Sequence, residues 1–174
     1  RARRVAHAYA SIWNGDSPLR LITLSQCERL QQMLRESHGD AAPWVRVAMT
    51  YQGPTIADTI ADCQRRGIDR ICVLPLYPQY SATTTGAVFD QVARYLLGVR
   101  AQPGLRLVRD SHDAPGYLDA LAASVREHWD AHGRAEHLLL SFHGIPEANG
   151  RKGDPYGRQC ERTAELLAAQ LGLS

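Results

Sequence analysis

His143 is the residue whose type and position best suit it to chemistry. It follows an apolar run at residues 138–142, which predicts a buried strand, and it precedes Gly144, so its ring can project beyond the strand end. Neutral imidazole accepts a proton or binds a divalent metal near pH 7. The structural alternative is a histidine hydrogen-bonded into a loop. Of the six other histidines, only His112 also follows a predicted strand, and it is the weaker candidate.

A second candidate region is the aromatic loop, residues 77–86, which carries Tyr77 and Tyr80 and then one serine and three threonines. Flat apolar rings beside hydroxyl groups suit a large planar ligand with polar edges better than they suit a phosphate. The sequence also contains none of the glycine-rich fingerprints of nucleotide-binding sites. In the alternative interpretation, the tyrosines pack between sheet and helix while the threonines cap the next helix.

The elements that would position these side chains alternate along the chain. Runs rich in Val, Ile and Leu predict buried parallel strands at residues 45–49, 71–76, 105–108 and 138–142. Helical patterns between them predict an α/β fold with an open parallel sheet. In such sheets ligands bind outside the carboxyl ends of the strands. We therefore expect a pocket where residues 50–54, the aromatic loop, residues 109–113 and the histidine segment (residues 141–146) meet.

Apolar stripes and boundary residues predict the helices. The stripes are Leu24, Cys27, Leu30 and Leu34; Ile56, Ile60 and Cys63; Val88, Val92 and Tyr95; Leu118, Leu121, Val125 and Trp129; and Tyr156, Cys160, Ala164, Leu167 and Leu171. Ser25 and Glu28 have capping-box spacing, and Asp154 precedes a proline that suits a first helical turn. Gly67 and Gly172 are suited to end helices. Residues 1–13 read as an amphipathic helix.

Composition excludes several classes of protein. The net charge of +2 and the scattered arginines do not favour nucleic-acid binding. No apolar run approaches the roughly 18 residues typical of a membrane span. The four cysteines form no C-x-x-C pair, and three lie on predicted apolar positions, so we expect neither a zinc site nor a disulfide framework. These features predict a cytoplasmic protein.

Four motifs, in order along essentially the whole chain, resemble those of ferrochelatases, which are class II chelatases. Residues 76–86 (LYPQYSATTTG) resemble the family's YPQYS-x-x-TTG stretch, and residues 141–146 (SFHGIP) resemble the segment that holds its catalytic histidine. Residues 153–156 (GDPY) resemble its GDPY helix start. Ser17-Pro18-Leu19, with Thr23 and Gln26, resembles its SPL-x-x-x-T-x-x-Q element. The matches identify the chain as the central portion of such an enzyme.

The resemblance implies two Rossmann-like lobes with a porphyrin cleft between them, both incomplete here: residues 1–100 as part of the first and residues 101–174 as the start of the second. It implies a lyase of haem biosynthesis that inserts ferrous iron into protoporphyrin IX. His143 would accept a pyrrole proton or ligate the incoming iron. The residues implied to line the porphyrin cleft are Ser17, Tyr51, Tyr77, Tyr80 and Ser81. Family analogy is also compatible with a peripheral membrane contact, and the oligomeric state is left open.

Two departures from the family pattern narrow the expectation. Thr50 stands where the family usually has arginine, which removes an expected contact to a porphyrin propionate. Ala82 stands where some members have a cysteine ligand, so no iron–sulfur cluster is expected. The family's glutamate partner to the histidine is expected downstream of residue 174, and the isolated chain is expected to be inactive. The alternatives are a coproporphyrin- or cobalt-type class II chelatase and a non-catalytic α/β binding module.

Overall fold

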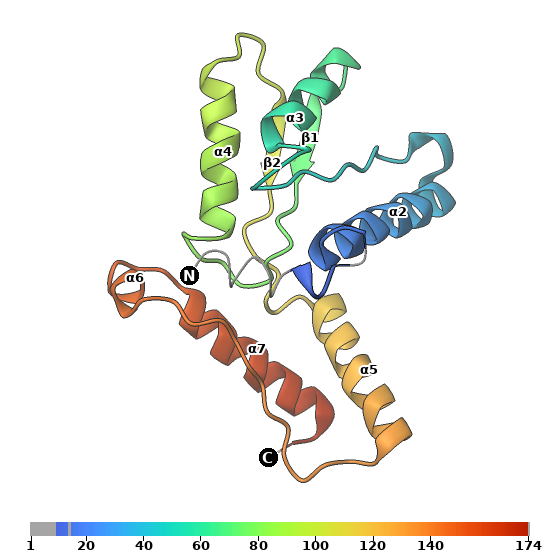
Figure 1. The fold of residues 1–174 in the computed structure, drawn as a ribbon, viewed down its shortest axis with the longest axis vertical. Helices are drawn as coiled ribbons and strands as arrows, with labels where there is room; N and C mark the ends of the chain where they lie inside the picture. Colours follow the sequence, from blue (N-terminus) through green and yellow to red (C-terminus); the bar gives the residue numbers. More distant parts are fainter. Residues whose placement is uncertain (1–9, 14, 174) are drawn as a thin grey trace. The chain divides into compact units, whose positions relative to one another are not determined.

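The computed structural model describes residues 10–13 and 15–173, so the predicted helix at residues 1–13 lies almost entirely outside the described residues. Its packing divides the chain into two compact units, Arg1–Asp62 and Cys63–Ser174. The fold is α/β with a parallel sheet, as predicted (Figure 1). The predicted lobe boundary after residue 100 stays a prediction.

The first unit is built on α2 (Pro18–His38), which is followed by the short 3-10 helix η1 (Gly39–Ala41). Ser17 is the N-cap and Pro18 the first helical residue, where its fixed φ and missing N–H cost nothing. The capping-box spacing of Ser25 and Glu28 therefore does not mark the start of this helix, because α2 already begins at Pro18. Gly39, at φ +56°, ends α2.

Helix α3 (Ile56–Arg65) begins with a side-chain cap and ends at a glycine turn. The Thr55 hydroxyl oxygen accepts the N–H of Asp58 at 3.1 Å and donates to its carboxylate at 2.6 Å. At the other end, Gly67 has φ +74° and donates its N–H to the Gln64 carbonyl at 2.9 Å. The predicted stop at Gly67 is confirmed, and Pro54 lies just before the helix.

The second unit contains the sheet. Strands β1 (Arg70–Val73) and β2 (Gly104–Leu107) pair in parallel, with Ile71 opposite Leu105, and α4 (Thr85–Leu97) lies in the crossover between them. β1 is shorter than the predicted residues 71–76, because its ladder with β2 ends at Val73. Exposure alternates along β1, so Cys72 is exposed although it lies in a run predicted to be a buried strand.

Two predicted strands, residues 45–49 and 138–142, are wrong. In the first, Met49 makes an isolated bridge with Thr55, and in the second the chain is irregular. A strand requires a hydrogen-bonded neighbour, whereas an apolar run indicates only burial. Leu138 and Leu140 are half-buried against the core of the second unit without pairing.

That core lies between α5 (Pro115–His132) and α7 (Tyr156–Leu171), which pack together (Figure 1). Its buried residues are Leu118, Ala122, Leu167 and Leu171, with Leu121, Val125, Trp129 and Leu166 packed against them. The apolar stripes predicted for both helices are confirmed, as is Gly172 as the left-handed end of α7. The five-residue helix α6 (Glu147–Arg151) had no apolar stripe to predict it.

No helix within the described ranges is long and apolar enough to cross a membrane.

Candidate functional site

The loops that follow β1 and β2 lie together. The N–H of Ser111 donates to the carbonyl of Pro78 at 2.8 Å, joining residues 109–113 to the aromatic loop. Parallel neighbouring strands end at the same edge of a sheet, so the loops that follow β1 and β2 are expected to meet there. The expectation that these two segments meet is confirmed.

A buried polar interface joins the aromatic loop to α7. Gln79 donates from its amide to the Thr163 hydroxyl at 3.1 Å, and the N–H of Tyr80 donates to the Gln159 side-chain carbonyl at 2.6 Å. Gln79, Gln159 and Thr163 are all buried. Polar groups buried without partners are costly, so these paired groups fix the loop in one register on the helix.

Asp154 holds the middle of the aromatic loop. One carboxylate oxygen accepts the Ser81 hydroxyl at 2.9 Å and the N–H of Ala82 at 2.8 Å, while the other accepts the N–H of Tyr156 at 3.1 Å. Burial alone would raise the pKa of Asp154, but the N–H groups of Ala82 and Tyr156 and the Ser81 hydroxyl outweigh it and lower the pKa. The ionised carboxylate is therefore the form that the loop stabilises.

The two tyrosines of the aromatic loop have different surroundings. The Arg109 guanidinium lies 4.4 Å from the centre of the Tyr80 ring and pairs with the Asp110 carboxylate at 2.6 Å. Gly86 leaves room for Tyr80, since a Cβ at that position would come 3.1 Å from the Tyr80 hydroxyl. Tyr77 is exposed, so the sheet-and-helix packing weighed as its alternative does not occur.

The alternative interpretation of the aromatic loop also expected its threonines to cap α4, and the structure does not show such a cap. Thr84 is the N-cap, but it makes no side-chain cap hydrogen bond, and its hydroxyl donates to the Ser81 carbonyl at 3.3 Å. Ser81 itself is fully buried. Ser81 is therefore part of the framework that holds the loop, whereas exposed Tyr77 and half-buried Tyr80 are available to a ligand.

His143 is exposed in the histidine segment, where five of the six residues are exposed. The Tyr156 hydroxyl lies near the backbone of His143 and the Cys160 side chain. Burial, together with Cys160, raises the pKa of Tyr156, and burial raises the pKa of Cys160. Both groups are therefore neutral near pH 7, and His143 beside them is exposed.

Ser17 and Tyr51 belong to the first unit and lie there on separate segments. Ser17 is half-buried at the start of α2, with its N–H donated to Asp16 at 2.7 Å. Tyr51 follows the Met49 bridge and is 82% exposed. Both are accessible, and their place in a porphyrin cleft stays a prediction.

His112, the weaker histidine candidate, is half-buried. Its Nδ1 lies 3.4 Å from the Asp110 carboxylate and 3.9 Å from that of Asp113. No group of three or more His, Cys, Asp or Glu side chains in the described part of the chain is arranged to hold a metal ion. The described geometry thus adds no support for His112 as a ligand.

Sequence reasoning missed the role of three residues. Gln159 was not singled out, Thr163 was noted only as following the GDPY motif, and Asp154 was expected only as a helix cap and a member of that motif. Gln159 and Thr163 lie beside Cys160 on the buried face of α7, so two polar residues on an otherwise apolar face were the available signal. A buried glutamine requires partners on both sides of its amide, which predicts a second segment against the helix.

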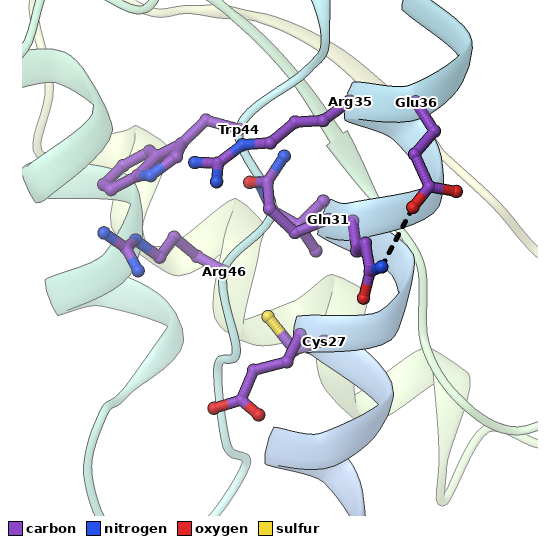
Figure 2. A pocket seen from close by; sticks show the side chains of 9 residues that line it. Cys27, Gln31, Arg35, Glu36, Trp44 and Arg46 are labelled. Carbon is purple, nitrogen blue, oxygen red and sulfur yellow. Dashed lines mark hydrogen bonds between the residues drawn. The ribbon is translucent and has the colours of Figure 1, made fainter.

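Each unit also has a hollow of its own. In the first unit, about 550 Å³ lies between α2 and residues 44–46, with Arg46 stacked 3.8 Å over Trp44 (Figure 2). Gln31, which lines the hollow, donates from its amide to the Pro43 carbonyl and accepts the Val45 N–H. None of the predicted site residues lines this hollow. The hollow of the second unit, about 270 Å³, is lined in part by Ser141 and Phe142, next to His143.

Comparison with known proteins agrees with the motifs. The family model described as Ferrochelatase matches residues 1–174. The ferrochelatase of Aeromonas hydrophila is 48% identical over 99% of this chain and 53% of its own length. That of Azoarcus sp. strain BH72 is 47% identical over 100% of this chain and 47% of its own length. The chain thus spans about half the length of these curated relatives, and it belongs to the ferrochelatase family.

Proposed function

We propose that this chain is the central part of an enzyme that inserts ferrous iron into protoporphyrin IX, with iron as a substrate metal and no iron–sulfur cluster. The observation that carries the proposal is the family match over all 174 residues. The exposure of His143, which follows Phe142 in the histidine segment, supports it. Family analogy further suggests a cytoplasmic reaction with a peripheral membrane contact.

The proposed reaction exchanges one dication for two protons. Ferrous iron forms bonds to the four pyrrole nitrogens, and the two N–H protons of the porphyrin are released, so charge balances without any redox change. His143 accepts one of these protons or ligates the incoming iron. A base that is neutral before the reaction does not repel the entering cation.

The porphyrin would meet the aromatic loop through its flat face. Tyr77 offers an exposed ring, and Tyr80 offers a ring backed by Arg109. Aromatic rings gain free energy by stacking on a flat apolar ligand. Ser17 and Tyr51 are proposed to complete the lining. Coproporphyrin and cobalt-type chelation are the competing reactions, and the choice of substrates in the test separates them.

A chimera tests the proposal. In it, this chain replaces the matching segment of the Aeromonas hydrophila ferrochelatase, to which it is 48% identical. We expect the chimera to form zinc protoporphyrin, followed by its fluorescence, and protohaem from ferrous iron, followed by absorbance. A folded chimera that inserts neither metal would contradict the proposal, and one that prefers coproporphyrin or cobalt would reassign its substrate.

We also propose that the 174-residue chain alone does not turn over, because it spans about half the length of its relatives. The same zinc assay on the isolated chain tests this. Turnover close to that of the chimera would contradict it.

A further inference from the structure

We infer that Gln159 and Asp154 are positioning residues, which hold residues 80–82 of the aromatic loop against the start of α7 and so fix the surface presented to the porphyrin. The inference rests on the proposed function. Neither residue is assigned a contact with substrate; both act through the loop.

Gln159 joins three segments through one buried side chain. Its carbonyl oxygen accepts the Tyr80 N–H at 2.6 Å, and its amide nitrogen donates to the Asp110 carboxylate at 3.0 Å. Because one partner is a donor and the other an acceptor, the amide has a single orientation that satisfies both. A side chain without an acceptor leaves the Tyr80 N–H unpaired at a site where Gln159 is only 7% exposed.

Asp154 fixes the next two residues of the loop. It accepts the Ser81 hydroxyl and the Ala82 N–H on one oxygen, at 2.9 and 2.8 Å. With Gln159 on Tyr80, three consecutive loop residues are bonded to side chains at or near the first turn of α7. A rigid helix is a better platform for such bonds than another loop would be.

The same first turn also reaches the predicted catalytic residue. The Tyr156 hydroxyl lies near the backbone of His143. The start of α7 therefore holds residues 80–82 of the aromatic loop and lies beside the backbone that carries His143. Displacing the loop from α7 would change the distance between porphyrin and histidine without removing either.

The decisive comparison is between two glutamines on α7. Gln159→Leu removes the bond to Tyr80 of the aromatic loop and the bond to Asp110. Gln170→Leu is the matched control, because Gln170 also donates to an aspartate of another segment, Asp119 at 2.6 Å, but makes no contact with the loop. Both variants are made in the chimera, and the KM for protoporphyrin and the kcat are measured by zinc insertion.

We expect Gln159→Leu to raise the KM for protoporphyrin about tenfold or more, which corresponds to about 1.4 kcal/mol of lost binding, with a smaller change in kcat. Gln170→Leu is expected to leave both constants unchanged. Equal effects of the two substitutions would overturn the inference.

Two further measurements keep the test decisive. If Gln159→Leu does not fold, Gln159→Glu and Asp154→Asn replace it, since each keeps part of the hydrogen bonding. A KM equal to that of the unsubstituted chimera in both variants would overturn the inference.

Hydrogen exchange of peptides covering residues 78–86 gives a readout that needs no activity. Faster exchange in Gln159→Leu but not in Gln170→Leu supports the positioning role of Gln159, even in a chimera without chelatase turnover. Equal exchange in the two variants overturns it.

Discussion

The aromatic loop and the histidine segment both carry side chains proposed to meet the porphyrin, but they are held in different ways. In the aromatic loop, Gln79 and Ser81 are buried, and the loop is bonded to α7 and to residues 109–113. In the histidine segment, five of six residues are exposed, and Tyr156 of α7 lies near the backbone of His143.

The difference agrees with the role proposed for each segment. A surface that receives a rigid planar ligand works best when it is formed before the ligand arrives, because no ordering cost is then paid on binding. A base that exchanges protons needs access to its ring. Substitutions should therefore affect stability and binding in the aromatic loop, and turnover in the histidine segment.

The largest expected effect is the loss of turnover in His143→Ala. Removing a general base typically slows a reaction by about 10²–10⁴-fold, whereas an exposed side chain changes stability by no more than about 0.5 kcal/mol. Zinc insertion and thermal unfolding of the chimera measure the two quantities. His128→Ala, an exposed histidine on α5, is the control and should change neither. Near-normal turnover in a folded His143→Ala chimera would remove His143 from the chemistry.

A pair of serines tests the comparison through stability. Ser81→Ala removes a donor from the buried bond to Asp154 and is expected to cost about 1–3 kcal/mol of unfolding free energy. Ser141→Ala removes a hydroxyl from an exposed residue and should cost no more than about 0.5 kcal/mol. Urea unfolding of the two chimeras, followed by fluorescence, measures both. Equal losses would mean that the two segments are held alike.

Much of this arrangement could be predicted from the sequence. The apolar stripes of α5 and α7 gave their buried faces, because helical periodicity reports directly which side is covered. The order of β1 and β2 predicted that their following loops meet. His143 and the aromatic loop were singled out from residue type and place, and their roles stay predictions, whereas the motif resemblance agrees with the family match.

The remaining features depend on partners that one segment does not reveal. Residues 45–49 and 138–142 have the composition of strands, yet strand pairing depends on a neighbour elsewhere in the chain. The bonds of Gln159 to Tyr80 and Asp110 join positions 79 and 49 residues away. Ser81 was expected to line a cleft, and its complete burial depends on Asp154, which lies 73 residues further along.

The smallest expected effect is a dependence of the aromatic loop on pH. Because the pKa of Asp154 is lowered in the folded chain, ionised Asp154 contributes stability that is fully present above its usual pKa of 3.8 and is lost as pH falls through the lowered value. The positive charge of Arg109 also lowers the pKa of Asp154. Protonation of the Asp154 carboxylate weakens it as the acceptor for the Ser81 hydroxyl and the Ala82 N–H.

Hydrogen exchange between pH 5 and pH 3, corrected for intrinsic rates, measures this dependence in the chimera. Peptides covering residues 78–86 should lose protection as pH falls, by less than Ser81→Ala causes at pH 7, while peptides covering residues 141–145 should not change. Asp154→Asn is the control: it should have low protection in the aromatic loop already at pH 5 and no further loss. If protection of the aromatic loop falls equally with pH in Asp154→Asn, the loop is held by a different titrating group, because that substitution removes only the carboxylate of Asp154.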